Sequence, residues 1–407
     1  MKIRWITPLL GTAPAMEVID NPDIVLIDVR DLVDKAGNTE ETVKDKIVRG
    51  AESMVSGKKT VIACDYGISR SNAIAAGILA RFEGIPLKQA LKQVMVATGE
   101  TEIKLEPLSV VRRALGENRA AVPAGRRSVL ITGGTGFLGV PITGQLEKEF
   151  KVTAPKRSEL ELMQGSTLLD LIAEESGADC IVHCANPRVY TSNLAIGNTL
   201  TMLRNVLDVC VTRNLRLIYL SGWEIYSGYP SDSLRADEYL PPLPKGPYGE
   251  TKYLCEMLIE HSRKTRGLQC TILRSSPVYG VGGDKPKFIY NFINKISRSE
   301  QIVTHKYRNG RPALDLLYID DLVAAVVSVV RTDSSCDFNL GTGCLTTTRG
   351  IAEILLELLN GKSELTELPL NADIANISMD SAKAKAVLGW KANVSLKQGL
   401  QKIIAIH

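Results

Sequence analysis

The stretch TGGTGFLG, residues Thr132–Gly139, decides the fold of the larger part of this chain. It follows the apolar run 128–131, which has the length and composition of a buried strand. An amphipathic segment over 137–150 comes next and predicts a helix. A strand, a glycine-rich turn and a helix in this order form the first half of a dinucleotide-binding unit.

Each glycine of this turn has its own task. Gly133 lets the backbone turn sharply, Gly136 lets it approach a pyrophosphate, and Gly139 lets the helix pack closely on the strand. The helix N-terminus then offers free N–H groups and a partial positive charge to the phosphates. The spacing GxxGxxG is one residue longer than the commonest fingerprint, so the assignment depends on the rest of the chain.

Length and composition narrow the function classes. The 407 residues favour two or three domains, and the nearly balanced charge of +4, without a basic run among aromatics, predicts no nucleic-acid partner. No uninterrupted apolar run reaches the roughly 18 residues of a membrane span, so we expect no membrane partner. The stretch WITPLL, 5–10, predicts a first strand rather than a signal peptide. The eight cysteines show no metal-ligand or redox-motif spacing, so we expect no metal and a reduced, cytoplasmic protein.

The chain divides into two predicted α/β units. Residues 1–116 form the first, residues 117–127 hold the Pro and Gly of a linker, and residues 128–407 form the second. The predicted strands of the first unit are 23–28 and 59–63, and its predicted helices are 38–56, 71–82, 87–95 and 108–115.

Between strand 59–63 and the following helix lies CDYGISRS, Cys64–Ser71. A loop that closes onto a helix N-terminus points several N–H groups at one centre and so binds an anion. The same field favours a thiolate, which makes Cys64 a nucleophile near neutral pH. Arg70 can hold two phosphate oxygens with its planar fork, Ser71 can hydrogen-bond the sulfur, and Gly67 permits the tight turn.

With these residues, most of 1–116 resembles the dual-specificity, cysteine-dependent phosphatases. The resemblance implies phosphate-monoester hydrolysis through a phosphocysteine. It also implies an aspartate general acid, for which we favour Asp34 over Asp31. The family usually has His before the cysteine, and this chain has Ala63, which removes one group that tunes the thiol. A domain that binds phosphate without cleaving the ester is the alternative.

Tyr248–Lys252, YGETK, is the main catalytic motif of the second unit. On a helix, this spacing puts the phenol and the ammonium on one face. Lys252 can bind the nicotinamide ribose and lower the pKa of Tyr248, which then exchanges a proton with a substrate hydroxyl while hydride moves.

Together with the glycine turn, this motif makes residues 128–407 resemble the extended short-chain dehydrogenase/reductase family, which holds sugar-nucleotide epimerases, dehydratases and reductases. The resemblance implies a Rossmann-type doubly wound parallel sheet with a small C-terminal substrate subdomain. A homodimer that pairs through the helices around Asn198 and Tyr248 is common in the family. The implied cofactor-binding residues are Gly133, Thr135, Gly136, Phe137, Leu138, Gly139, Lys156, Arg157, Ala185, Tyr248, Lys252, Ser275 and Val278.

The end of the second strand bears on cofactor choice. NAD-preferring members place an acidic residue there for the ribose hydroxyls, whereas this chain has Lys156 and Arg157. Two cations suit a 2′-phosphate, so we predict NADP and leave NAD open. The alternative is that both side chains are merely solvated. His183, in the next strand, is expected to be a core histidine.

The third catalytic group departs from the family pattern. In LSGWEIYSG, 220–228, Gly222 stands where the family has Ser or Thr. Ser221 would substitute if the backbone shifted. Glu224 stands where the dehydratases of the family have a glutamate base, and Trp223 replaces their aspartate. Glu224 is therefore either a catalytic base or a solvated loop residue.

Three functions remain open from the residues and the resemblances. The first is a bifunctional enzyme that couples phosphate-monoester hydrolysis to NAD(P)-dependent oxidation, reduction or epimerisation of a sugar, nucleoside or nucleotide, with a phosphorylated small molecule as substrate. The second is a regulatory protein phosphatase whose other domain senses the NADP redox state, which Gly222 favours. The third is a scaffold that only binds ligands, against which Cys64, Arg70, Tyr248 and Lys252 argue.

Overall fold

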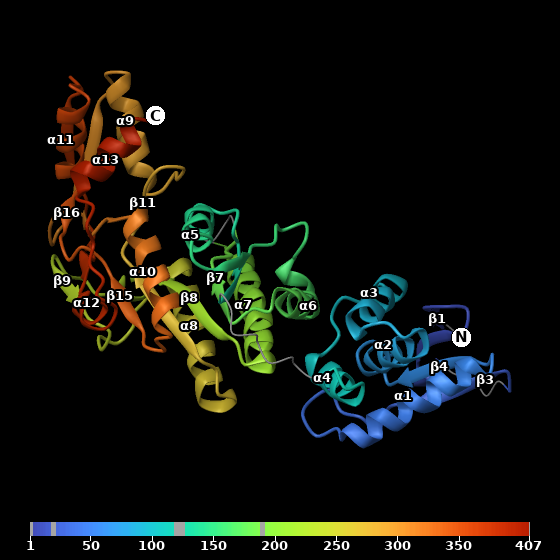
Figure 1. Cartoon of the computed structure of the whole chain (residues 1–407). Helices are drawn as coiled ribbons and strands as arrows, with labels where there is room; N and C mark the ends of the chain where they lie inside the picture. The colour runs from blue at the N-terminus through green and yellow to red at the C-terminus, as the bar shows by residue number, and fades with distance from the viewer. Residues whose placement is uncertain (1–2, 18–21, 118–126, 188–191, 407) are drawn as a thin grey trace. The chain divides into compact units, whose positions relative to one another are not determined.

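The computed structural model describes residues 3–17, 22–117, 127–187 and 192–406. They belong to two compact units (Figure 1). The first comprises residues 1–125, 160–177 and 208–214, and the second comprises 126–159, 178–207 and 215–407. Most of the predicted linker, 118–126, lies outside the described residues.

The first unit is built on a four-stranded sheet of order β1-β2-β4-β3. Strands β2, β4 and β3 run parallel, and β1 is antiparallel to β2. The strands are β1 (Arg4–Trp5), β2 (Leu10–Pro14), β3 (Ile24–Asp28) and β4 (Lys59–Cys64). The helices are α1 (Glu40–Val55), α2 (Arg70–Glu83), α3 (Leu87–Thr98), α4 (Leu105–Ala114) and α6 (Thr167–Ser176), with the 3-10 turns η1 (Ala15–Glu17) and η2 (Leu162–Gln164).

Helix α2 is the centre of this unit, because its residues 70–80 are all buried and α1, α3 and α4 all pack against it. Two glycines let α1 and α2 approach closely. A Cβ on Gly50 would overlap Ile78, and a Cβ on Gly77 would overlap Ile47 and Val111. The buried helix follows directly on β4, so the loop between them is held at both ends.

The predicted first strand over 5–10 is wrong. Strand β1 ends at Trp5 and β2 begins at Leu10, with a turn between them. The Thr7 hydroxyl accepts a hydrogen bond from Leu10 N at 3.0 Å, and Pro8 has no N–H for a strand ladder. The apolar composition of residues 5–10 predicted a strand and gave no sign of this turn.

Helix α6 belongs to the first compact unit by its contacts. Thr167 Oγ1 bonds to both the N–H and the carbonyl oxygen of Ile103, at 3.0 and 2.9 Å. Buried Asp170 pairs with Arg213, and Arg112 Nη2 lies 2.9 Å from Glu174.

The second unit contains a six-stranded, all-parallel sheet of order β15-β10-β8-β7-β5-β6. These strands are β5 (Ser128–Thr132), β6 (Lys151–Thr153), β7 (Cys180–His183), β8 (Arg216–Gly222), β10 (Cys270–Ser275) and β15 (Phe338–Leu340). The helices are α5 (Gly139–Leu146), α7 (Asn193–Arg213), α8 (Pro247–Arg266), α9 (Lys287–Ser297), α10 (Ile319–Thr332), α11 (Thr348–Leu358), α12 (Ala382–Leu388) and α13 (Leu396–Ile404), with the 3-10 turn η3 (Trp223–Tyr226).

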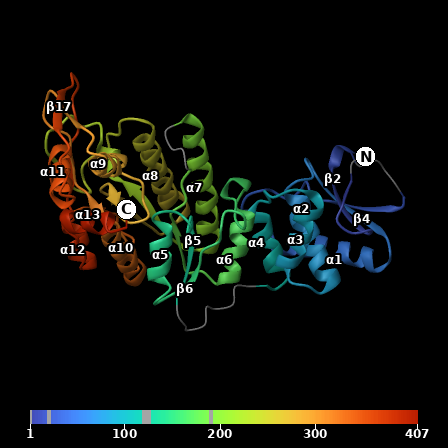
Figure 2. The same cartoon turned by 90° about the horizontal axis from the view of Figure 1, so that it is seen from above.

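Figure 2 shows α5 and α10 on one side of this sheet and α7 and α8 on the other. The prediction of a Rossmann-type doubly wound sheet is therefore confirmed. Short strand pairs form the C-terminal part of the unit: β9 (Leu234–Ala236) with β18 (Ile377–Met379), β11 (Val278–Tyr279) with β14 (Leu317–Tyr318), β12 (Ile302–Lys306) with β17 (Leu365–Pro369), and β13 (Ala313–Leu314) with β16 (Thr346–Thr347).

Helix α7 is, among the described residues, the one helix long and apolar enough to cross a membrane by length and composition. It lies against the sheet of the second unit in Figure 2, and 44% of its apolar window is buried within the structure. A core helix of a soluble protein passes the same test, so length and composition alone do not make α7 a membrane span.

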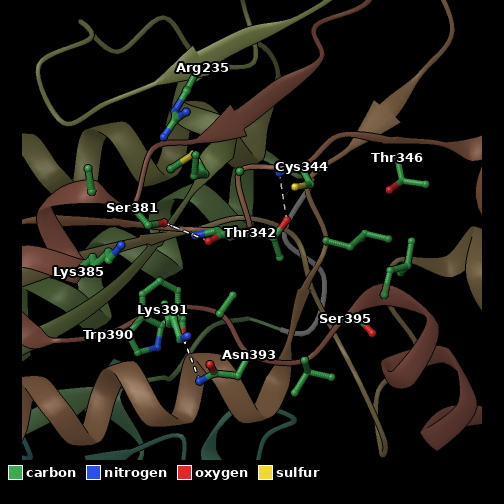
Figure 3. A pocket seen from close by; sticks show the side chains of 18 residues that line it. Arg235, Thr342, Cys344, Thr346, Ser381, Lys385, Trp390, Lys391, Asn393 and Ser395 are labelled. Atoms are coloured by element: carbon green, nitrogen blue, oxygen red, sulfur yellow. Dashed lines mark hydrogen bonds between the residues drawn. The ribbon is translucent and has the colours of Figure 1, made fainter.

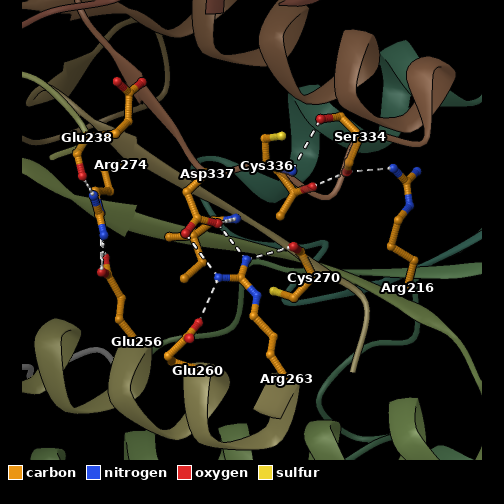
Figure 4. A network of polar contacts seen from close by, with 12 residues as sticks. Arg216, Glu238, Glu256, Glu260, Arg263, Cys270, Arg274, Ser334, Cys336 and Asp337 are labelled. Atoms are coloured by element: carbon orange, nitrogen blue, oxygen red, sulfur yellow. Dashed lines mark hydrogen bonds and ion pairs between the residues drawn. The ribbon is translucent and has the colours of Figure 1, made fainter. Parts of the chain in front are cut away.

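Helix α8 is tied to the sheet by two buried or half-buried ion pairs (Figure 4). Arg274 of β10 bonds Glu256 of α8 through Nε and Nη2, with the shortest contact at 2.8 Å. The same guanidinium donates to the Tyr226 hydroxyl of η3 at 3.0 Å. Arg263, near the end of α8, pairs with Asp337 ahead of β15. Arg274 thus joins β10, α8 and η3.

We predict that Arg274→Ala lowers the free energy of unfolding of the second unit by about 3 to 5 kcal/mol, because it leaves the Glu256 carboxylate buried without its partner. Chemical denaturation followed by circular dichroism measures the loss. Arg349→Ala is the control, since it breaks the more exposed i,i+4 pair with Glu353, worth about 0.3 to 0.5 kcal/mol. Equal losses for the two variants would contradict the prediction.

Candidate functional sites

The loop Cys64–Arg70 surrounds the thiol of the first unit. Cys64 ends β4, and Gly67 N donates to its Sγ at 3.1 Å. Gly67 has φ +69°, and a Cβ there would overlap the backbone of Ala13 and Pro14, so only glycine fits this turn. The Arg4 guanidinium donates to the Gly67 carbonyl oxygen from β1. The loop is therefore fixed from both sides.

The Cys64 thiol is disposed to ionise. Burial raises its pKa, but the Ser71 hydroxyl, with its oxygen 3.4 Å from Sγ, and the backbone N–H groups of Ser71, Ile68 and Tyr66 together outweigh burial. The net pKa lies below the ordinary value of 9.0. The predicted interaction between Ser71 and the sulfur is present in the structure.

Arg70 extends beside the same loop. Its Nη1 donates to the Leu32 carbonyl oxygen at 2.7 Å, and its Nη2 bonds the Asp65 carboxylate at 2.5 Å. Asp34 lies 3.5 Å from Arg70 Nε, whereas Asp31 pairs with Lys46 at 2.9 Å. The structure thus brings Asp34, and not Asp31, to Arg70 of the loop Cys64–Arg70. Asp65 is a partner that the motif did not single out, although it lies inside it.

In the second unit, the glycine turn lies where the strand order reverses, with β6 on one side of β5 and β7 on the other. Gly133 has φ +75°, and a Cβ there would overlap the backbone of Ala185 just after β7. A Cβ on Gly139 would overlap the backbone of Gly133 and Gly134. Thr135 and Gly136 are exposed and Phe137 and Leu138 are half-buried, so the middle of the turn faces outward and is open to a ligand.

His183 is buried at the end of β7, with Nδ1 2.7 Å from the Thr132 hydroxyl. Burial, with the nearby Lys252 charge, lowers its pKa to about 3. The ring is therefore neutral at physiological pH, which fits the expected core histidine.

Lys156 and Arg157 follow β6 and are both exposed. The Lys156 N–H donates to the Glu159 carboxylate at 2.7 Å, so the loop closes on itself and both cationic side chains belong to its exposed part. This position follows the carboxyl end of the strand next to β5, where the fold places the adenosine ribose.

Tyr248 and Lys252 lie one turn apart at the start of α8. Lys252 is buried, and its Nζ donates to the Leu220 carbonyl oxygen at 2.8 Å and lies 5.6 Å from the centre of the Tyr248 ring. Burial lowers the pKa of the ammonium group. Tyr219 of β8 also contacts Nζ, at 3.4 Å. The sequence motifs did not predict this contact, because Tyr219 and Lys252 lie 33 residues apart and meet only when α8 packs on the sheet.

The end of β8 carries the third position, where this sequence differs from the family pattern. The ladder pairs Ser221 with Arg274 and Gly222 with Ser275, so Ser275 lies beside Gly222. Successive side chains of a strand point to opposite faces. Ser221 is buried with its Oγ unpaired, on the face opposite to a side chain at 222. By the same alternation, Ser221 shares a face of β8 with Tyr219, whose hydroxyl contacts Lys252 Nζ at 3.4 Å, and a place for Ser221 in the group formed by Tyr248 and Lys252 stays a prediction.

Glu224, in η3, is half-buried, so the alternative of a freely solvated residue does not hold. A Cβ added to Gly222 would overlap its Oε2 atom. Burial raises the pKa of Glu224 to about 7, against the lowering effect of its own backbone N–H and of Lys252.

Val278, a predicted cofactor-binding residue, begins β11, three residues after Ser275.

A separate pocket of about 650 Å³ lies in the C-terminal part of the second unit (Figure 3). Among its described lining residues are Arg235, Thr342, Cys344, Lys385 and Trp390. Neither Tyr248, Lys252 nor Glu224 lines it, so it is distinct from the predicted reaction site. Its lysines, Lys385 and Lys391, are exposed.

Comparisons with known proteins agree with this geometry. A model of the NAD dependent epimerase/dehydratase family matches residues 129–341. The dTDP-4-dehydro-6-deoxyglucose reductase of Escherichia coli is 28% identical over 317 residues, which cover 69% of this chain and 98% of that protein.

Two solved structures share the fold of the second unit. The UDP-glucose 4-epimerase of Thermotoga maritima, solved with UDP-glucose, is 24% identical with a TM-score of 0.60, over 68% of this chain and 97% of that one. The UDP-glucose 4-epimerase of Thermus thermophilus, solved with NAD, is 22% identical with a TM-score of 0.60, over 68% of this chain and 98% of that one. The chain belongs to the NAD dependent epimerase/dehydratase family.

Proposed function

We propose that the protein is a bifunctional enzyme whose second unit carries out NADP-dependent oxidation, reduction or epimerisation at a carbinol of a sugar nucleotide. The observation that carries this proposal is the placement of Tyr248 and buried Lys252 beside β8, in the sheet whose reversal point holds the glycine turn. Relatives named for UDP-glucose and dTDP-sugar chemistry support the substrate class.

The residues present fit a nicotinamide dinucleotide. The glycine turn has no Cβ where Gly133 and Gly139 approach neighbouring backbone, and its outward part leads into the N-terminus of α5, which suits a pyrophosphate. When bound, the nicotinamide ring accepts or supplies hydride. Ala185, Ser275 and Val278 follow or end strands at the same edge of the sheet.

The chain's own residues handle the proton and the orientation. Lys252 is fixed by the Leu220 carbonyl oxygen, and its charge favours the ionised form of a phenol nearby. Tyr248 then takes the proton of a substrate hydroxyl during oxidation and returns it during reduction. The lowered pKa of Lys252 follows from burial, which also excludes water from the ammonium group.

We further propose that the first unit hydrolyses a phosphate monoester, with Cys64 as nucleophile, Arg70 as the phosphate clamp and Asp34 as the general acid. The lowered pKa of Cys64, the fixed loop and the nearby Ser71 hydroxyl support it. A phosphate held by Arg70 would compete with Asp34 for the guanidinium, which would free that carboxyl group to protonate the leaving oxygen. A thiol nucleophile must stay reduced, so we place the protein in the cytoplasm.

The joining of two sites on one chain favours consecutive steps on one phosphorylated metabolite. The regulatory alternative was favoured by the missing hydroxyl at Gly222, which would cripple the second unit. The carboxyl group of Glu224 beside that position weakens this argument. Pairing of two copies through α7 and α8 remains a prediction from the family resemblance.

Cys64→Ser should abolish hydrolysis of p-nitrophenyl phosphate and leave cofactor binding unchanged, because the nucleophile is lost from the first unit alone.

Because its pKa is lowered, Cys64 should be alkylated as thiolate at pH values below 9.0, and Ser71→Ala should move the pH profile of alkylation to higher pH. Mass spectrometry of the labelled peptide as a function of pH measures the alkylation profile of the unaltered protein and of Ser71→Ala. An unchanged profile in Ser71→Ala would contradict the role of the hydroxyl.

Tyr248→Phe should lower turnover of a nucleotide sugar by about 10²- to 10⁴-fold, since the proton transfer loses its acid–base group. The Kd for NADPH, measured by fluorescence titration, should change little. Tyr253→Phe, on the same helix, is the matched control and should retain full turnover. A Tyr248→Phe protein as active as the control would rule out the proposed role.

Replacing Lys156 and Arg157 together by Ser should weaken NADP binding by about 10-fold or more and leave NAD binding unchanged, because only the 2′-phosphate loses its cations. Calorimetric titration of each dinucleotide measures the two Kd values. Lys148→Ser, an exposed lysine elsewhere in the unit, is the control. Equal weakening of NAD and NADP would show that the pair does not read the 2′-phosphate.

A further inference from the structure

We propose that the carboxyl group of Glu224 takes both the place and the task of the hydroxyl that Gly222 lacks, so that the second unit works with a Glu224–Tyr248–Lys252 group. This inference rests on the proposed function of the second unit. It assigns to Glu224 a hydrogen bond to the substrate oxygen during hydride transfer. This differs from the carbon-acid base that its place in the sequence suggested.

The geometry at the end of β8 carries the proposal. Gly222 has φ −152° and ψ 166°, an extended conformation open to any residue. The atom that bars a side chain there is Oε2 of Glu224, which a Cβ on Gly222 would overlap. Apart from the carboxyl group of Glu224, the nearest atom is the Ser275 carbonyl oxygen, 3.9 Å away. The carboxyl group therefore occupies the space that a Ser or Thr side chain would fill.

The backbone of Glu224 is held against the start of α8. Its carbonyl oxygen accepts from Ser227 Oγ at 2.7 Å and from Ser227 N at 3.1 Å. A Cβ on Gly249 would overlap the same carbonyl oxygen, so glycine is needed for this approach. Gly249 follows Tyr248 directly, so η3 and the catalytic turn of α8 lie side by side. Tyr226, two residues after Glu224, is in turn held by Arg274.

A carboxyl group can perform the hydroxyl's task when it is protonated. During oxidation the C–H bond breaks and its hydride passes to the nicotinamide dinucleotide, while the O–H proton passes to the Tyr248 oxygen. The substrate oxygen becomes a carbonyl oxygen, and the protonated Glu224 donates a hydrogen bond to it. The half-buried setting raises the pKa of Glu224 to about 7, so the protonated form is available near neutral pH. Lys252 is the charged group that acts on this carboxyl from α8.

The test is a double-mutant cycle on the full chain, measured as turnover of a nucleotide sugar with NADP. Glu224→Ala should lower kcat by about 10²- to 10³-fold, the usual loss for one donor to a developing oxyanion. Gly222→Ser alone should also lower kcat, because its side chain meets the Glu224 carboxyl group. In the Glu224→Ala background, Gly222→Ser should raise kcat at least about 10-fold. Glu364→Ala, an exposed glutamate elsewhere in the second unit, is the control.

The sign reversal of Gly222→Ser between the two backgrounds supports the proposal, and additive losses overturn it. Circular dichroism and NADPH titration of every variant separate misfolding from loss of chemistry. If the unaltered protein turns over no nucleotide sugar, the proposed function fails. If it is active and Glu224→Ala is as active, this inference alone fails. Retained function in Glu224→Gln, which keeps a hydrogen-bond donor, would further distinguish donation from proton abstraction.

Discussion

The second unit depends on one guanidinium group, that of Arg274. Arg274 extends from β10, and its Nε and Nη2 donate to the buried Glu256 carboxylate on α8. Its Nη1 donates to the Tyr226 hydroxyl on η3. One planar donor set therefore fixes the helix that carries Tyr248 and Lys252 and the turn that carries Glu224. A buried charge pair of this kind contributes little net stability compared with apolar packing, but breaking it is costly. We infer that its value to this fold is geometric, because it sets the distance between α8 and η3.

The first unit solves a different electrostatic problem. Its thiol is buried, which opposes ionisation, and the surrounding loop reverses that effect with one hydroxyl and several N–H donors. The loop can point these donors inward because Gly67 adopts a left-handed conformation against the backbone of β2, and because the buried helix α2 begins at Arg70. The loop surrounds the Cys64 sulfur with fixed donors, which is how preorganised sites favour developing charge.

Much of this was predictable from local patterns. The glycine turn, the parallel sheet and the helix that carries Tyr248 and Lys252 follow from residues close in sequence, whose spacing reflects direct geometric needs. The choice between Asp34 and Asp31 could not be made from spacing, since both lie in one loop and only its folded path brings Asp34 to Arg70. Ser221 shares a face of β8 with Tyr219, which contacts Lys252, whereas Glu224 fills the space beside Gly222, and spacing alone could not choose between them. Tyr219 and the Arg274–Glu256 pair act across the sheet, where no local pattern reports on them.

The measurement that tests the central claim most directly is a crystal structure of the protein with NADP and a nucleotide sugar bound. We expect the reacting sugar oxygen within hydrogen-bond distance of both the Tyr248 hydroxyl and the Glu224 carboxyl group, with Arg274 still joining α8 to η3. An oxygen that contacts Tyr248 while Glu224 turns away, or a sugar bound elsewhere in the second unit, would contradict the account.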